Sequence, residues 1–276
     1  MEVLPYRIIF TIMDLEVLIA RIIPIVQEAA AFILSQAGKV SDRDIETKSR
    51  NSLVSYVDKT AENILVNGLR SILPASGFIT EEETVAQSNA EYTWIIDPLD
   101  GTTNFLHNIP FYSVSVALQH GQELLAGIVH DVVHQESYYA WKGGGAWCNG
   151  LRVHVSDHDK IIDTVVATGF PYSATNVTPA MVSVFDYFLK NARGIRRLGS
   201  AALDLAYVAN GRFDVYYETS LNAWDIAGGT LLVMEAGGKV SDFKGGQQML
   251  IDGRIIASNG KVHSEAAGII QNYYPH

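Results

Sequence analysis

The segment WIIDPLDGTTNF, residues 94–105, decides how the rest of this sequence is interpreted. An apolar run leads directly into two aspartates, Asp97 and Asp100, with Pro98 between them. Because proline fixes φ, we expect a buried strand to end here and the chain to turn sharply. Both carboxylates could then face one point just past the strand. Gly101 has no Cβ, so the backbone there can closely approach a ligand.

The residues after Gly101 extend this expectation to an anion. If Thr102 and Thr103 open a helix, their free N–H groups form an anion pocket beside the two acids. Cation ligands next to an anion pocket are the arrangement that metal-assisted phosphate chemistry needs. Taken alone, Asp-Pro-x-Asp-Gly is also an ordinary surface turn. A solvated turn, however, does not usually follow an apolar run such as Trp-Ile-Ile.

Two further acidic segments are placed to join these aspartates. They are Glu81–Glu83, and Asp225 in the segment AWDIAGG. Each also has a structural interpretation: the triplet as a solvated loop, and Asp225 as the cap of a helix. Two carboxylates about 4 Å apart repel by about 4 kcal/mol at an effective dielectric of about 20, so four converging acids need bound cations. Oxygen ligands without supporting His or Cys point to Mg²⁺ rather than zinc.

Length, composition and charge limit the class of protein. The 276 residues, 48% of them hydrophobic, fit one large domain or two closely joined halves. We expect a single domain over residues 14–276, with lobes at about 14–155 and 156–276, after an N-terminal extension, 1–13. A net charge of −10 without a basic run argues against a nucleic-acid partner. The single cysteine, Cys148, excludes an internal disulfide and fits a reducing compartment.

The sequence predicts neither a membrane span nor a signal peptide. The most apolar N-terminal stretch, Val17–Val26, is interrupted by Arg21 and Pro24 and falls short of the roughly 20 residues that a span needs. The first twelve residues lack the positive start and the small-residue cleavage site of a signal peptide. We therefore expect a cytoplasmic protein. If Met13 is the natural start, deleting residues 1–12 should leave melting temperature and activity unchanged.

Hydrophobic periodicity predicts a mixed α+β half followed by an α/β half, that is, a layered α+β and α/β sandwich. The first half should contain helices over residues 14–37, kinked or broken at Pro24, and 58–73, with Asp58 near its start. Four consecutive antiparallel strands should follow, over residues 92–96, 112–118, 124–131 and 137–141. The second half should alternate short strands (164–168, 213–217, 239–240, 255–257) with helices (178–191, 200–209, 225–236 and one from 263).

Several other signals have structural explanations. His130 and His134 are spaced like zinc ligands on a helix, but their stretch is predicted to be strand and turn. The glycines at 143–145 fit a turn between strands, because no Gly-Lys-Ser/Thr follows them. Ser200 fits a helix cap better than a nucleophile. The pair at 196–197, Arg-Arg, could steer an anionic substrate or simply lie on the surface.

The chain resembles the inositol monophosphatase family of Mg²⁺-dependent, Li⁺-sensitive phosphatases. The resemblance rests on WIIDPLDGTTNF followed by WDIAGGTLLVMEAGG, residues 224–238, and it covers the chain from about residue 14 to the C-terminus. It implies the fold of that family, with an N-terminal antiparallel-sheet lobe and a C-terminal α/β lobe. It also implies two or three Mg²⁺ ions in the active site, a small phosphorylated polyol as substrate, and a homodimer.

The resemblance further implies roles for individual residues. The metal ligands would be Glu81, Asp97, the main-chain carbonyl of Leu99, Asp100 and Asp225, with Asp97 bridging two metals. The metal-bound water that attacks phosphorus would be oriented by Thr102 together with Glu81. Asp58 would lie close to Thr102, behind these ligands.

The substrate-binding residues implied by the same resemblance surround the phosphate and the leaving group. Backbone N–H groups of Gly101 and Thr102 would hold the phosphate, and Lys48 matches a family lysine on a loop near it. Glu218 matches an acid that binds a hydroxyl of the sugar-like ring, and Ala201 lines the same pocket.

We therefore expect Mg²⁺-dependent hydrolysis of a small phosphate monoester, with myo-inositol monophosphate as the first candidate and water attacking directly. The alternatives are the same chemistry on 3′-phosphoadenosine 5′-phosphate, fructose 1,6-bisphosphate or NADP, or a phosphatase-like regulatory protein acting through protein contacts. Glu218 favours a hydroxyl-rich ring over a nucleobase. Asn222, which stands where familiar animal members carry histidine, weakens that preference.

Overall fold

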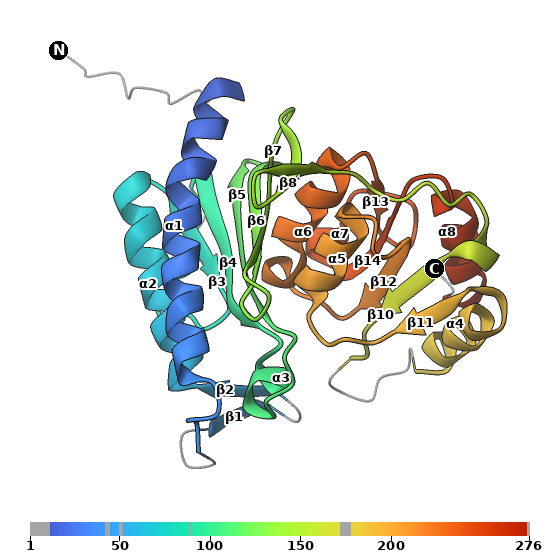
Figure 1. Cartoon of the computed structure of the whole chain (residues 1–276), viewed down its shortest axis with the longest axis horizontal. Helices are drawn as coiled ribbons and strands as arrows, with labels where there is room; N and C mark the ends of the chain where they lie inside the picture. Colours follow the sequence, from blue (N-terminus) through green and yellow to red (C-terminus); the bar gives the residue numbers. More distant parts are fainter. Residues whose placement is uncertain (1–11, 42–44, 50–51, 89, 172–177, 275–276) are drawn as a thin grey trace.

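Helices and sheets alternate in layers across the molecule (Figure 1). The structure, a computed structural model, describes residues 12–41, 45–49, 52–88, 90–171 and 178–274. Helices α1 and α2 cover one face of a seven-stranded sheet, and α5 and α6 lie between this sheet and a five-stranded one (Figure 1). Helices α4 and α8 cover the far face of the second sheet (Figure 1). The predicted layered α+β sandwich is therefore confirmed.

The described helices are α1 (Ile12–Gln36), α2 (Tyr56–Ile72), α3 (Thr102–Leu106), α4 (Thr178–Asn191), α5 (Ala201–Ala209), α6 (Ala223–Glu235), α7 (Met249–Asp252) and α8 (His263–Tyr273), with a 3₁₀ turn at Ile161–Asp163. The first sheet has the order β3 (Gly77–Thr80), β4 (Tyr92–Asp100), β5 (Ser113–His120), β6 (Glu123–Asp131), β7 (Glu136–Trp141), β8 (Gly145–Cys148), β9 (Leu151–Val153). The second has the order β11 (Gly194–Arg196), β10 (Val165–Thr168), β12 (Val215–Thr219), β14 (Arg254–Ser258), β13 (Lys239–Ser241). A separate hairpin joins β1 (Ile45–Ser49) and β2 (Ser52–Ser55).

Strand β4 lies between β3 and β5 in the first sheet and carries the decisive segment. Its residues are buried from Tyr92 to Leu99, which fits a strand covered on both faces. The strand continues through Asp97 to Asp100, so the sharp turn predicted at Pro98 is wrong. Instead, the register with β5 shifts between the two aspartates. A bulge of this kind tolerates proline, which lacks the N–H that a regular ladder position donates, and it re-aims the side chains beside it.

Helix α1 packs its apolar face onto α2 and the first sheet. Its buried residues recur at helical spacing and join the main core: Leu15, Leu18, Ile19, Ile22, Val26, Ala29, Ala30 and Ile33. The helix runs unbroken through Pro24, so the predicted break is wrong. By length and composition alone, residues 14–36 could also cross a membrane, contrary to the expectation from Val17–Val26. Burial of one whole side of the helix explains its apolar composition without a membrane.

A second core joins the two sheets through α5 and α6. Val129 and Tyr138 contribute to it from the first sheet, Leu205 and Ile226 from the two helices, and Tyr216 from the second sheet. The two halves of the chain therefore share one apolar interior.

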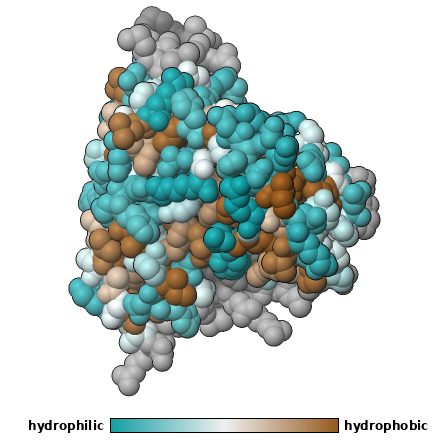
Figure 2. Space-filling model, turned by 45° about the vertical axis from the view of Figure 1, so that its right-hand side comes forward, coloured by the Kyte–Doolittle hydropathy of each residue, from teal (hydrophilic) through white to brown (hydrophobic). Residues whose placement is uncertain are grey.

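Hydrophilic side chains cover most of the face in Figure 2, with hydrophobic ones in separate patches.

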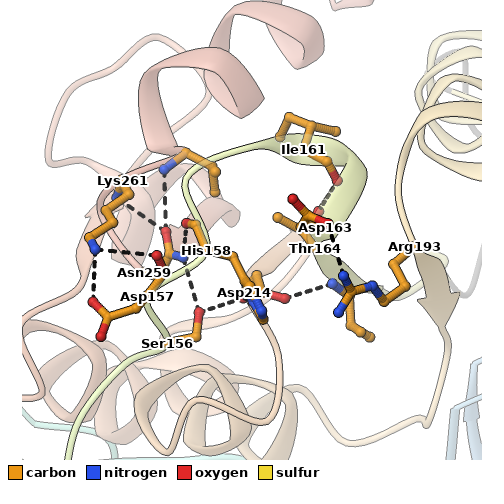
Figure 3. Close-up of polar contacts among 12 residues, drawn as sticks. Ser156, Asp157, His158, Ile161, Asp163, Thr164, Arg193, Asp214, Asn259 and Lys261 are labelled. Carbon is orange, nitrogen blue, oxygen red and sulfur yellow. Dashed lines mark hydrogen bonds and ion pairs between the residues drawn. The ribbon is translucent and has the colours of Figure 1, made fainter.

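The connection from β9 to β10 is fixed by one buried aspartate, Asp214 (Figure 3). Its carboxylate accepts hydrogen bonds from the Ser156 hydroxyl, from His158 Nδ1 at 2.8 Å and from the Val165 N–H at 2.6 Å. Asn259 donates to the His158 carbonyl at 2.8 Å. This network ties the crossing segment to the second sheet.

Most predicted elements are present, with shifts at their ends. The four antiparallel strands are β4 to β7, and the helices of the second half are α4, α5, α6 and α8. Helix α2 begins before Asp58, because Ser55 caps it and Asp58 closes the capping box. The short strands β1, β2, β3, β8, β9 and β11 and the short helix α7 were not predicted, whereas α3 is the helix that was considered at Thr102 and Thr103.

Candidate functional site

A cavity opens where β4 ends, between the two halves of the chain. It receives residues from the loop after β3, from the start of α5 and α6, and from the end of β12. Most of the residues that the sequence singled out line it: Glu81, Asp97, Leu99, Asp100, Gly101, Thr102, Ala201, Glu218 and Asp225. The structure therefore brings together acids that lie up to 144 positions apart in the sequence, from 81 to 225.

The two aspartates of β4 are held by different partners. Asp97 is buried, and its Oδ1 accepts a hydrogen bond from the Leu99 N–H at 3.0 Å. Asp100 Oδ2 accepts from the Ser200 hydroxyl at 2.6 Å and from the Ala202 N–H at 2.7 Å. Ser200 also caps α5, as predicted, so the start of that helix fixes the position of Asp100.

Gly101 and Thr102 turn the chain from β4 into helix α3. Gly101 has a φ of +97°, a conformation that residues with a side chain rarely adopt, and a Cβ there would lie 3.0 Å from the Phe111 carbonyl oxygen. The backbone conformation and the lack of space both exclude a larger residue. The Thr102 hydroxyl lies 3.0 Å from Asp58 Oδ1 and 3.0 Å from the Leu99 carbonyl. Asp58, fully buried near the start of α2, also accepts from the Ser55 N–H and hydroxyl. The predicted proximity of Asp58 and Thr102 is present.

The remaining acids come from the loop after β3 and from α6. Asp225 Oδ2 accepts from the Asn222 N–H at 2.6 Å, so this aspartate caps α6 and lines the cavity at the same time. Glu81 follows β3 directly, and its N–H donates to the Ile96 carbonyl at 3.2 Å. Buried Glu62 fixes the loop beyond Glu81 by accepting from the N–H groups of residues 82 and 84, both at 2.7 Å. Nothing in the sequence pattern pointed to Glu62.

Burial raises the pKa values of Asp97, Asp100 and Asp225, and repulsion between the acids adds to this effect at Asp97 and Asp225. The pKa of Asp97 is well above its ordinary value because of burial first and then the charges of Glu81, Asp100 and Asp225. Burial and the charge of Asp100 do the same to the pKa of Asp225. Burial raises the pKa of Asp100 to about 6, against the hydrogen bonds from Ser200 and α5. A cation in the cavity would remove this electrostatic cost.

The chemistry of the donors fits a hard divalent cation. Carboxylates and a main-chain carbonyl are the ligands that Mg²⁺ takes in proteins. Within the described residues, however, no three His, Cys, Asp or Glu side chains already converge on one point as a metal-holding group. Asp97, Asp100 and Asp225 each accept a hydrogen bond from another group of the protein. The cavity is therefore acidic and rich in oxygen without being a closed coordination shell.

The other end of the cavity is formed by the second half of the chain. Burial raises the pKa of Glu218 to about 7, although Tyr216 donates a hydrogen bond to it at 2.6 Å. Asp204, one helical turn after Ala201, also lines the cavity, and burial and the charge of Glu218 raise its pKa. Arg197 lines the cavity too, and its guanidinium lies 5.7 Å from the centre of the Phe170 ring.

The structure thus separates the two arginines that the sequence left undecided. Both side chains are exposed, but Arg197 lines the cavity and Arg196 does not. Asp204 was missed, although its spacing from Ala201 on α5 puts both on one helix face and could have revealed it. Lys48 lies in β1, but its side chain is outside the described residues, so its predicted role near phosphate stays a prediction.

Of the signals that were given structural explanations, Ser200 lines the cavity while it caps α5, and the histidines and the glycines at 143–145 lie away from the lining. His130 is buried, with Nδ1 2.8 Å from the Ser137 hydroxyl, and His134 pairs with Asp131 at 2.9 Å. The glycines at 143–145 form the turn between β7 and β8. Burial raises the pKa of the Cys148 thiol, which is the opposite of what a reactive cysteine needs.

Comparisons with known proteins agree across most of the chain. The sequence profile of the inositol monophosphatase family matches residues 14–274. An inositol-1-monophosphatase of Mesorhizobium japonicum is 43% identical, over 80% of this chain and 84% of that protein. A protein of Pasteurella multocida named Nus factor SuhB is 39% identical, over 83% of this chain and 86% of its own length. The crystal structure of the extragenic suppressor protein SuhB from Bartonella henselae is similar with a TM-score of 0.88 at 35% identity, covering 92% of this chain and 98% of that one.

Proposed function

Because the chain belongs to the inositol monophosphatase family, we propose that it is a Mg²⁺-dependent phosphatase whose substrate is a small polyol phosphate, with myo-inositol monophosphate as the first candidate. Membership of the family supports a phosphatase. The identity of the metal and of the substrate goes beyond family membership and is our proposal. The observation that carries them is the cavity at the end of β4, which Glu81, Asp97, Asp100 and Asp225 line together and where burial raises the pKa values of the three aspartates.

The residues that would hold Mg²⁺ are Glu81, Asp97, Asp100, Asp225 and the carbonyl of Leu99. When bound, Mg²⁺ supplies positive charge against the phosphate and makes water more acidic. The protein's own contribution is to keep these oxygen donors on rigid elements. Asp97 and Asp100 are fixed by the bulge in β4, and Asp225 by the first turn of α6.

The attack on phosphorus depends on Thr102 and its partners. The Thr102 hydroxyl is held between Asp58 and the Leu99 carbonyl, so its oxygen has a defined position beside the acids. From there it can accept a hydrogen bond from the attacking water, while Glu81 takes up the proton of that water. The N–H groups of Gly101 and Thr102 provide donors for the phosphate oxygens. Water attacks phosphorus in line, the bond between phosphorus and the leaving-group oxygen breaks on the opposite side, and that oxygen takes up a proton from solvent. No protein nucleophile is required.

The leaving group would lie toward Glu218. Carboxylates at this end, Glu218 and Asp204, accept hydrogen bonds from hydroxyl groups and repel further phosphate. Arg197 is the cationic side chain that lines the described cavity, and it offsets part of that repulsion. The balance favours a neutral, hydroxyl-rich leaving group over the bisphosphates and nucleotides among the alternatives.

Phosphate release from a panel of esters tests this proposal. The purified chain should release phosphate from myo-inositol 1-phosphate with Mg²⁺, should stop when the metal is chelated, and should be inhibited by Li⁺. The value of kcat/KM should be higher for inositol monophosphate than for fructose 1,6-bisphosphate, 3′-phosphoadenosine 5′-phosphate or NADP. A higher kcat/KM for one of these would transfer the assignment to that substrate.

A regulatory role through protein contacts is the second candidate. It is favoured by the relatives named Nus factor SuhB, such as that of Pasteurella multocida. A chain that binds Mg²⁺ in calorimetry but releases phosphate from none of the esters would support this candidate over the first. The homodimer stays a prediction, which light scattering coupled to size-exclusion chromatography would test.

A further inference from the structure

A buried phenol lies directly behind the acid at the leaving-group end of the cavity. Tyr216 is fully buried, and its hydroxyl donates to Glu218 Oε2 at 2.6 Å. Both residues belong to β12 and are two positions apart, so their side chains point to the same face of the strand. The strand therefore fixes the donor and the acceptor relative to each other before any substrate binds.

Gly169, which follows β10, lies against the same carboxylate. A Cβ at position 169 would lie 2.0 Å from Glu218 Oε1 and 2.1 Å from both Cδ and Oε2, so any other residue there would displace the carboxylate. Gly169 and Glu218 both line the cavity. The Glu218 carboxylate is thus held by a hydrogen bond, and it has space because position 169 carries no side chain.

Other charged groups near Glu218 act on it at a distance. Asp100 and Asp204 repel it and Arg197 attracts it, but the hydrogen bond that the described residues give its side chain comes from Tyr216. A glutamate side chain without such a bond has several rotamers of similar energy, and holding one of them costs conformational entropy when a ligand binds. Losing the bond would therefore weaken recognition of the ligand.

We propose that Tyr216 is a positioning residue: it fixes the Glu218 carboxylate for a hydroxyl of the substrate's leaving group, and Gly169 provides the space. The inference rests on the proposed function, because it assumes that the leaving group lies against Glu218. The inference implies that the group recognised by Glu218 is an uncharged ring that carries hydroxyls. It also implies that selectivity for this leaving group depends on Tyr216, which lies behind Glu218.

The test uses Tyr216→Phe, which removes one oxygen atom and retains the ring, on two matched esters. Myo-inositol 1-phosphate carries ring hydroxyls, and cyclohexyl phosphate has the same ring without them. We expect kcat/KM for the inositol ester to fall about tenfold, mainly through KM, since one hydrogen bond to a charged group is lost. For cyclohexyl phosphate the change should stay within about twofold. Equal losses on both esters, or no loss on either, would overturn the proposal.

A double-mutant cycle then asks whether Tyr216 acts through Glu218. Glu218→Gln should cause a similar selective loss, and the double variant Tyr216→Phe/Glu218→Gln should lose little more than Glu218→Gln alone. Additive losses would contradict the inference. Gly169→Ala provides an independent variant: its Cβ should displace the carboxylate and lower the selectivity for the inositol ester, while thermal melting shows that the fold is retained.

Tyr217→Phe is the matched control, because it removes the same atom from the neighbouring tyrosine. Tyr217 points to the other face of β12 and packs 5.5 Å from the Phe188 ring, in a different part of the core. It should leave the ratio of the two kcat/KM values unchanged.

If the wild type hydrolyses neither ester with Mg²⁺, the proposed function fails, and the positioning is decided by a crystal structure of Tyr216→Phe. A displaced Glu218 carboxylate supports the inference and an unmoved one refutes it.

Discussion

Asp97 shows at the scale of one residue how the fold and the chemistry are linked. It is buried in strand β4, near three other acids, where its charge is disfavoured by desolvation and by repulsion. A residue kept for stability alone would be apolar at this position, because a buried unpaired charge costs several kcal/mol. The aspartate at this position is therefore explained by its proposed role as a ligand of Mg²⁺.

Replacing Asp97 by asparagine should separate activity from stability. We expect kcat to fall by about a thousandfold or more, since a ligand of the catalytic ions is lost. Without metal the variant should melt at the same temperature as the wild type or higher, because burial of one repelled carboxylate is relieved. Steady-state kinetics and thermal melting with and without Mg²⁺ measure both effects. Asp159→Asn, an exposed aspartate outside the cavity, is the control, and near-normal turnover of Asp97→Asn with Mg²⁺ would contradict the assignment.

A second residue, His263, should make stability depend on pH. It is buried between the hydroxyls of Ser241 and Ser258, at 3.0 and 2.9 Å, and burial lowers its pKa from 6.5 to about 4. Between these values the unfolded chain binds a proton that the folded chain does not, so stability should fall as the pH drops from about 6.5 to about 4.

His263→Gln should remove this part of the pH dependence. Relative to the variant, the wild type should lose about tenfold or more in its folding equilibrium constant across the window from pH 6.5 to 4. Urea unfolding at a series of pH values measures the difference, with His154→Gln, an exposed histidine, as control. Parallel pH profiles of the wild type and His263→Gln would refute the prediction.

Which site residues the sequence reveals depends on their chemical type. Asp97, Asp100 and Asp225 stand out because acids directly beside apolar runs need an explanation. Tyr216 does not, because a tyrosine inside a strand is as typical of the core as of a site. Whether Arg197 faces the cavity or solvent depends on the path of the loop before α5, which has no local signal.

At the scale of elements, β4 shows why a correct motif gave an incorrect boundary. Asp-Pro-Leu-Asp has turn composition, so the strand was predicted to end at Ile96. Pairing with β5 overrides this local preference, and the chain accommodates Pro98 by a register shift between Asp97 and Asp100. The short strand β3, parallel to β4, was missed because four residues carry too little periodicity.

The segment that crosses from β9 to β10 depends on Asp214, and its replacement should show this. Asp214→Asn keeps the shape but replaces one acceptor oxygen by a donor, so at least one of the Ser156, His158 and Val165 donors loses its partner (Figure 3). We expect the free energy of unfolding to fall by about 2–4 kcal/mol.

Chemical denaturation of Asp214→Asn measures this loss. The control is Asp186→Asn, which breaks only an exposed ion pair with Lys190 on α4 and should change stability by less than about 0.5 kcal/mol. Similar small effects for both variants would show that the crossing segment is not fixed by Asp214.

At the scale of the whole molecule, the layer formed by α5 and α6 determines how the protein unfolds. Both helices contribute to an apolar core that also includes residues of each sheet, so this shared core joins the separate cores of the two halves of the chain. The sequence predicted two lobes, at about 14–155 and 156–276, but the apolar pattern of a helix does not show that it packs between two sheets.

This arrangement predicts a single cooperative unfolding transition. Tryptophan fluorescence reports mainly on the first sheet, through Trp94, Trp141 and Trp147, whereas far-UV circular dichroism reports on all elements. Melting curves from the two probes should coincide, and the calorimetric enthalpy should equal the van't Hoff enthalpy. Two separated transitions would show that the lobes unfold independently.

The packing of α1 also has a consequence for synthesis of the protein on the ribosome. This apolar helix ends at Gln36, but the sheet residues that cover it continue to β7, which ends at Trp141. About a hundred residues must therefore be translated after α1 before its cover is complete. At a translation rate of roughly 5–20 residues per second, this apolar helix stays uncovered for about 5–20 seconds. During that time chaperones and the membrane-targeting machinery can bind it.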